Sequence, residues 1–182
     1  MKFKKVLSSL IKDFGVQNVR YGLIGGFSLI ILGIPRTTVD LGFLIHRDDL
    51  KKLDKIMEMK GYKLIFRTEN VSQYVGETAT LGEVDFVHAF RRYSKKMLRR
   101  AQIRKLGDLA IKVLCLEDIV GLKVQAIAND AARKNRELAD IEAILAKYRD
   151  EANWELLNEY FHLFNLDDDF NILSRRYRDV DR

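Results

Sequence analysis

Cysteine, proline and histidine are all scarce in this chain of 182 residues. Cys115 is the only cysteine, which excludes an intramolecular disulfide and any cysteine-based zinc cage. The three histidines, His46, His88 and His162, are far apart and lack metal-ligand spacing. One proline, with 47% hydrophobic and 32% charged residues, excludes collagen-like and disordered chains. We therefore expect an ordinary globular protein.

Long apolar runs are also missing. The longest uncharged run, from Tyr21 to Pro35, contains glycines and is shorter than the ~20 residues that a membrane-spanning helix needs. The apolar stretch near the N-terminus is interrupted by Lys12 and Asp13, and no small-residue cleavage site follows. We expect a cytoplasmic protein with no membrane partner.

The formal net charge is +6, and the excess of basic residues is local. Eight basic residues and no acidic one lie between Arg91 and Lys105: Arg91, Arg92, Lys95, Lys96, Arg99, Arg100, Arg104 and Lys105. Such a segment attracts polyanions, although a solvated helix face has the same composition.

Hydrophobic periodicity predicts an α/β half over residues 1–114. Helices are expected at 3–14, ended by Gly15, at 27–32, closed by Gly33, and at 48–60, capped by Asp48 or Asp49 and terminated by Gly61. A short helix is expected after Arg91. Strands are expected at 20–24, 38–45, 62–67, 72–77, 83–88 and 109–114.

Helical patterns alone follow, at 116–128, 133–148, 151–164 and 167–177. The predicted organisation is a mixed sheet flanked by helices over residues 1–114, with a helical subdomain over 115–182 packed on that core. No linker rich in Gly, Ser or Pro separates the two.

Three short motifs carry candidate chemistry. The first is Gly25-Gly26-Phe27-Ser28, between a strand and a helix, where glycines permit a tight turn and close approach of a phosphate. Ser28 adds a hydroxyl donor. Plain turn formation accounts for two glycines equally well.

The other two motifs are Pro35–Asp40 and Glu83–Asp85. Arg36 offers a fork for phosphate, and Asp40 places a carboxylate in an otherwise apolar strand. Glu83 and Asp85 alternate with apolar residues and therefore share one face of a strand. Bound Mg²⁺ would explain these acids, and so would a strand edge that faces water.

In this order the motifs resemble those of the nucleotidyltransferase (DNA polymerase β-like) superfamily, and in particular its small bacterial minimal and abortive-infection toxin-type branch. Gly25–Ser28 matches the glycine turn, Asp40 the first aspartate of Asp-x-Asp, and Asp85 the third carboxylate. Lys123, and a later helix with Asp140, match the helices that follow. The resemblance spans about residues 5–147.

One position departs from that pattern. Gly42 stands where the family has the second aspartate of Asp-x-Asp, a ligand shared by two metal ions. Catalysis could have been lost while nucleotide or RNA binding remained, Glu83 could substitute, or Gly42 could be an introduced variant.

The resemblance implies Mg²⁺- or Mn²⁺-dependent transfer of a nucleoside monophosphate from a nucleoside triphosphate to an RNA or protein hydroxyl. It implies metal binding by Asp40 and Asp85, with Glu83 as a further candidate, and a catalytic role for Lys123. Gly25, Gly26, Ser28 and Arg36 would hold the nucleotide. The acceptor would be an RNA held by Arg91, Arg92, Lys95, Lys96, Arg99 and Arg100, or a protein. The alternative is a catalytically impaired binding module, or a toxin–antitoxin component with a protein partner.

Overall fold

The computed structural model describes residues 1–178. The chain divides into two compact units, Met1–Leu114 and Cys115–Arg182.

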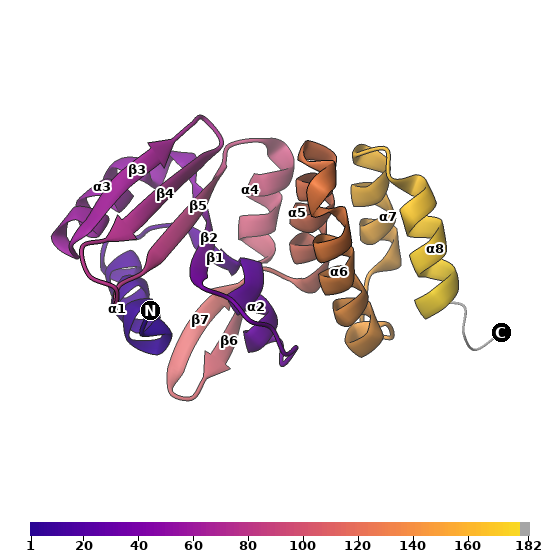
Figure 1. Cartoon of the computed structure of the whole chain (residues 1–182), viewed down its shortest axis with the longest axis horizontal. Coiled ribbons are helices and arrows are strands. Elements are labelled where there is room, and N and C mark those ends of the chain that lie inside the picture. Colours follow the sequence, from indigo (N-terminus) through magenta and orange to yellow (C-terminus); the bar gives the residue numbers. More distant parts are fainter. Residues whose placement is uncertain (179–182) are drawn as a thin grey trace. The chain divides into compact units, whose positions relative to one another are not determined.

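The first unit is built on one mixed sheet of seven strands (Figure 1). In spatial order they are β3 (Tyr62–Arg67), β4 (Val71–Gly76), β5 (Glu83–Ala89), β2 (Asp40–His46), β1 (Tyr21–Ile24), β7 (Leu109–Val113) and β6 (Gln102–Leu106). The β2–β5 and β1–β7 pairs are parallel, and the remaining pairs are antiparallel. The predicted mixed sheet is confirmed.

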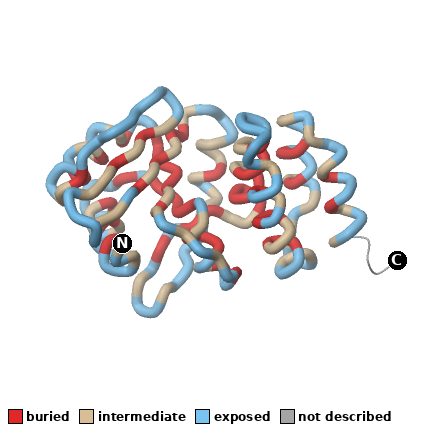
Figure 2. Tube along the Cα trace, viewed as in Figure 1, coloured by how far each residue is buried: buried red, intermediate tan, exposed pale blue. Residues whose placement is uncertain are grey.

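One face of this sheet packs on the helices α1 (Phe3–Val16) and α3 (Leu50–Met59). Phe14 of α1 makes an edge contact with Phe43 of β2, and their ring centroids are 5.5 Å apart. Asp54 of α3 accepts a hydrogen bond from the Tyr74 hydroxyl of β4. Figure 2 shows buried chain along the central strands and exposed chain along the edge strand β3. The aromatic core therefore lies on the face that carries Phe43.

The opposite face carries α4 (Arg92–Arg100), which contacts β2 and β5. A Cβ on Gly22 would lie 3.6 Å from the Cβ of Ala101, the residue that ends α4. Gly22 pairs with Leu44, and side chains two residues apart on a strand share a face. Leu44, Gly42 and Asp40 therefore share the face on which α4 lies. The helix α2 (Gly25–Ile31) follows β1 directly.

The second unit is helical, with α5 (Leu116–Asn129), α6 (Lys134–Tyr148), α7 (Trp154–Leu163) and α8 (Asp167–Tyr177). Tyr160 and Phe161 of α7 are fully buried, and the Tyr160 hydroxyl donates a hydrogen bond to buried Asp118 at 2.6 Å. Short 3₁₀ turns occupy Arg47–Asp49 and Ala131–Arg133. Within residues 1–178, no helix is long and apolar enough to cross a membrane.

Several local predictions were wrong. The helix α1 continues through Gly15 to Val16, and the chain turns at Asn18, whose φ is +50°. Asp49 makes no capping hydrogen bond, because its carboxylate instead accepts hydrogen bonds from Arg20. The strand β6 was missed, since its basic residues and exposed surface give no apolar alternation.

Candidate active site

Pairing between β2 and β5 brings the predicted acids together. The parallel register places Asp40 beside Glu83 and Gly42 beside Asp85. Because side chains alternate across a strand, these four positions share one face of the sheet. Glu83 is exposed, whereas Asp40 and Asp85 are partly buried. Three carboxylates and a gap at Gly42 therefore lie on neighbouring strands.

Asp85 is the most perturbed of these acids. Its Oδ1 atom is buried and has no hydrogen-bond partner within the described structure. Burial, with the nearby charges of Asp40 and Glu83, raises the pKa of Asp85 to about 6, against a smaller lowering by the Gln73 side chain. A buried carboxylate oxygen without a donor is costly, and a cation would satisfy it.

The glycine turn lies beside the same face. Gly25 has a φ of +72°, and a Cβ at this position would lie 4.0 Å from the Cα of Gly42. A Cβ on Gly26 would clash with Thr38 at 2.8 Å. The Thr38 hydroxyl donates a hydrogen bond to Asp40 Oδ1 at 2.8 Å. Gly26 thus permits the close packing of Thr38 that orients Asp40.

Arg36 and Ser28 differ in what they offer a ligand. Arg36 is partly buried, and its side-chain stem would lie 3.6 Å from a Cβ on Gly26. Its stem therefore lies beside the glycine turn. Ser28 is fully buried, and its hydroxyl donates to the Gly25 carbonyl at 2.7 Å. In this arrangement the Ser28 hydroxyl stabilises the backbone at Gly25 and is not exposed to a ligand.

No group of three or more His, Cys, Asp or Glu side chains in residues 1–178 is arranged to hold a metal ion alone. Mg²⁺, however, is usually bound by one or two carboxylates together with substrate phosphates. Asp85, with its unsatisfied buried oxygen, and neighbouring Asp40 fit that donor set. The residues therefore suit a metal that arrives with a nucleotide.

Gly42 leaves room for a side chain on the acidic face. A Cβ there would lie 3.3 Å from Cγ1 of Ile24, so that flexible side chain would shift by a few tenths of an ångström. Its φ lies outside the left-handed region. The backbone would thus accept an aspartate at this position.

Lys123 lies in the second unit, on α5. It is buried, and its ammonium group donates to Glu137 at 2.9 Å and to Asp140 at 2.6 Å. Lys123 and the Arg133 and Arg136 side chains lower the pKa of Glu137 to about 2, against the effect of burial. The contact between Lys123 and Glu137 was not predicted from the sequence. Two carboxylates already balance the charge of Lys123.

No protein-family model matches this chain, and no curated protein matches it. Solved structures do match. The antibiotic-resistance factor ANT(2'')-Ia aligns over 98% of this chain and 99% of its own, with a TM-score of 0.67 and 11% identity. The chain has the nucleotidyltransferase fold.

Two further structures share this nucleotidyltransferase fold. An antigenic nucleotidyltransferase-like protein from Paracoccidioides brasiliensis aligns over 96% of this chain and 92% of its own, with a TM-score of 0.57 and 18% identity. The lincosamide antibiotic adenylyltransferase LnuA aligns over 77% of this chain and 94% of its own, with a TM-score of 0.56 and 15% identity. At such identities the likeness establishes the fold and no more.

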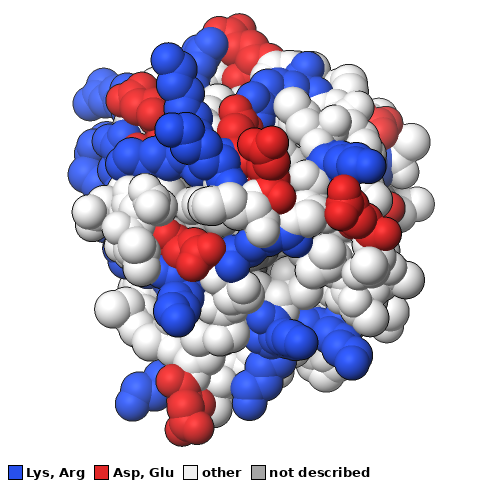
Figure 3. Space-filling model, turned by 90° about the vertical axis from the view of Figure 1, so that its left-hand side faces the viewer, with Lys and Arg blue, Asp and Glu red and all other residues white. Residues whose placement is uncertain are grey.

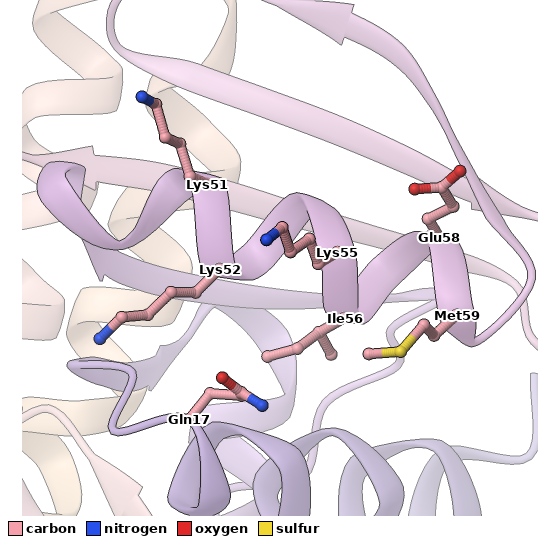
Figure 4. A pocket seen from close by; sticks show the side chains of 7 residues that line it. All are labelled: Gln17, Lys51, Lys52, Lys55, Ile56, Glu58 and Met59. Carbon is pink, nitrogen blue, oxygen red and sulfur yellow. The ribbon is translucent and has the colours of Figure 1, made fainter.

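A separate hollow lies on the side of the first unit that bears α3. Gln17, the residue that ends α1, lines it together with Lys51, Lys52, Lys55, Ile56, Glu58 and Met59 of α3. Figure 4 shows the lysine ammonium groups pointing in different directions. Figure 3, which views the α3 and β3 side, shows acidic side chains among the basic ones. This hollow lacks the convergent groups of a catalytic site.

Proposed function

We propose that this protein transfers a nucleoside monophosphate from a nucleoside triphosphate to an acceptor hydroxyl, releasing pyrophosphate and the hydroxyl proton, with Mg²⁺ or Mn²⁺ as cofactor. The observation that carries the proposal is the unsatisfied buried oxygen of Asp85, next to Asp40 and Glu83 on one sheet face. The nucleotidyltransferase fold of the whole chain supports it.

Each candidate site residue of the first unit has a distinct role in this proposal. Asp40 and Asp85 hold the metal, and Thr38 keeps the Asp40 carboxylate oriented. The Gly25 turn gives phosphates access to the acidic face, and Arg36 offsets their charge. Ser28 holds the turn in shape. When bound, the metal stabilises negative charge on the transferred phosphoryl group.

The proposed acceptor is an RNA or a protein hydroxyl. Among structures of similar fold, ANT(2'')-Ia has been captured with adenylyl-2''-tobramycin and LnuA with lincomycin, so the fold also handles small antibiotics. A test of this chain must therefore offer acceptors of all three classes.

Label transfer tests the proposal directly. Each α-labelled nucleoside triphosphate is incubated with the protein, Mg²⁺ or Mn²⁺, and separated RNA, protein and small-molecule fractions of a bacterial lysate. We expect label on one fraction with the wild type and none with Asp85→Asn. Glu58→Gln removes an exposed acid on α3 and serves as the control. Equal labelling by wild type and Asp85→Asn would refute the assignment of the site.

Gly42 favours a second candidate function, a catalytically impaired nucleotide- or RNA-binding module, including a toxin–antitoxin component that acts through a protein partner. The acidic face then holds metal and nucleotide without turnover, because one metal ligand is missing. Metal-dependent nucleotide binding by wild type, without label transfer to any fraction, would support this candidate over the first.

A further inference from the structure

The helix α4 carries a face lined with basic side chains. Arg92, Lys96 and Arg99 recur at i, i+4 and i+7, with Lys95 beside them, and therefore line one side of the helix. Arg92 and Arg99 are exposed, whereas Met97 is buried beneath. Within residues 1–178, these four basic residues form no ion pair with Asp or Glu. Their charges are thus available to an external anion.

Several other basic residues of the first unit are paired with acids. Lys52 contacts Asp49, Lys60 contacts Asp13, and Arg67 pairs with Asp54. The hollow by α3 also contains Glu58. The basic face of α4 therefore differs from these paired residues, and it differs from the exposed Lys51 and Lys55 of α3 in lying on the same face of the sheet as Asp40.

The position of α4 connects this face with the proposed active site. The end of α4 reaches Gly22, which pairs with Leu44 on the face that also carries Gly42 and Asp40. Leu44 lies two positions after Gly42, which is roughly 7 Å along the strand. An anion that lies along α4 is therefore brought to the edge of the acidic face.

A surface that carries both arginine and aromatic side chains favours nucleic acid over other polyanions. Guanidinium groups bind phosphates through two parallel hydrogen bonds, and exposed rings stack on bases. Tyr93 is 39% exposed on α4, and the Lys96 ammonium group lies 6.0 Å from the centroid of its ring. Basic side chains interleaved with aromatic rings are typical of a surface that binds single-stranded nucleic acid.

We propose that α4 is the binding surface for a single nucleic-acid strand, which it delivers as acceptor to the Asp40–Asp85 face. The acceptor part of this inference rests on the proposed nucleotidyl transfer. The inference favours an anionic acceptor over a positively charged one, because the basic side chains of α4 would repel a cation.

The test compares two variants with the same change in charge. Arg92→Gln/Arg99→Gln removes two charges from α4, and Lys51→Gln/Lys55→Gln removes two from exposed positions on α3. Binding of fluorescent 12-nucleotide RNA and DNA strands is measured by anisotropy from 50 to 300 mM salt. We expect the α4 variant to bind at least 10-fold more weakly, with a salt slope smaller by about 1.4, and the α3 variant to bind within 2-fold of wild type.

Three results would overturn the proposal: no binding of either strand by folded wild type, equal weakening in both variants, or binding of polyglutamate as tight as that of RNA. The last would indicate an acidic protein as the partner. The RNA and DNA measurements identify which nucleic acid is held. Calorimetry with ATP and Mg²⁺ separates this inference from the proposed function, because the α4 variant should keep wild-type nucleotide affinity even when strand binding is lost.

Discussion

At the scale of single residues, Asp85 combines partial burial with an incomplete set of hydrogen bonds. Its Oδ1 atom is buried without a donor, and two further carboxylates lie close by. A residue selected for stability alone would be an amide or an apolar side chain. In the proposed function, the bound metal supplies the missing partner.

We predict that Asp85→Asn stabilises the protein without metal. The folded state raises the pKa of Asp85 to about 6, so it holds this proton more tightly than the unfolded chain does. The free energy of unfolding of wild type therefore falls as pH rises from below 4 through 6, and it stays lower above pH 6. After a discount for partial exposure, the variant should be more stable by on the order of 1–2 kcal/mol at pH 7.5. Urea unfolding at several pH values measures this difference.

The difference between Asp85→Asn and wild type should vanish near pH 3, where the carboxyl is protonated in both states. Addition of Mg²⁺ and a nucleoside triphosphate should stabilise wild type and leave the variant unchanged. A variant less stable than wild type at pH 7.5 would show that the carboxylate has a structural partner instead.

We predict that Gly42→Asp strengthens metal binding. A Cβ at this position needs only a small shift of Ile24, and the new carboxylate would lie beside Asp85 in the parallel register. Metal affinity measured by Mn²⁺ titration with ATP should rise by about 10-fold or more, and label transfer should rise with it. Gly42→Asn supplies the same bulk without charge, and an equal gain with that variant would contradict the prediction.

At the scale of elements, the parallel β2–β5 pair converts separate sequence motifs into one site. The sequence predicted both strands and the shared face of Glu83 and Asp85, because alternation of apolar and acidic residues is a local signal. It did not predict that Asp40 lies opposite Glu83, since register between strands distant in sequence leaves no local trace. The strand β6 was missed for a related reason. It lies at the edge of the sheet and is held by antiparallel pairing with β7, and its own sequence has no apolar alternation.

The helix α5 gives a prediction about Lys123. Replacing it by Met would leave the Asp140 and Glu137 carboxylates buried, although Arg133 and Arg136 still contact Glu137. We expect a loss of about 2–4 kcal/mol at pH 7, measured by urea unfolding. Lys134→Met removes a half-exposed partner of Asp169 and should cost under about 1 kcal/mol. Wild-type stability of Lys123→Met would contradict a structural role for this lysine.

At the scale of the whole molecule, the order of motifs in the sequence was enough to predict the nucleotidyltransferase fold, which structural similarity confirms. That prediction rested on a family resemblance. The structure adds that Gly25 has a positive φ, that Thr38 donates a hydrogen bond to Asp40, and that the acids of β2 and β5 share one face of the sheet. Ser28 shows the limit of such reasoning. The sequence suggested that its hydroxyl contacts a ligand, whereas in the structure this hydroxyl donates a hydrogen bond to the Gly25 carbonyl. The acceptor that we propose is likewise inferred from surface charge and not from the fold.

Calorimetric titration of each nucleoside triphosphate into the protein, with Mg²⁺ and with excess chelator, shows whether the Asp40–Asp85 face holds a metal and a nucleotide. We expect nucleotide binding to weaken at least 10-fold on removal of the metal or in Asp85→Asn, and to stay unchanged in Glu58→Gln. Binding of equal strength with and without metal, or no binding of any nucleotide by folded wild type, would contradict this expectation.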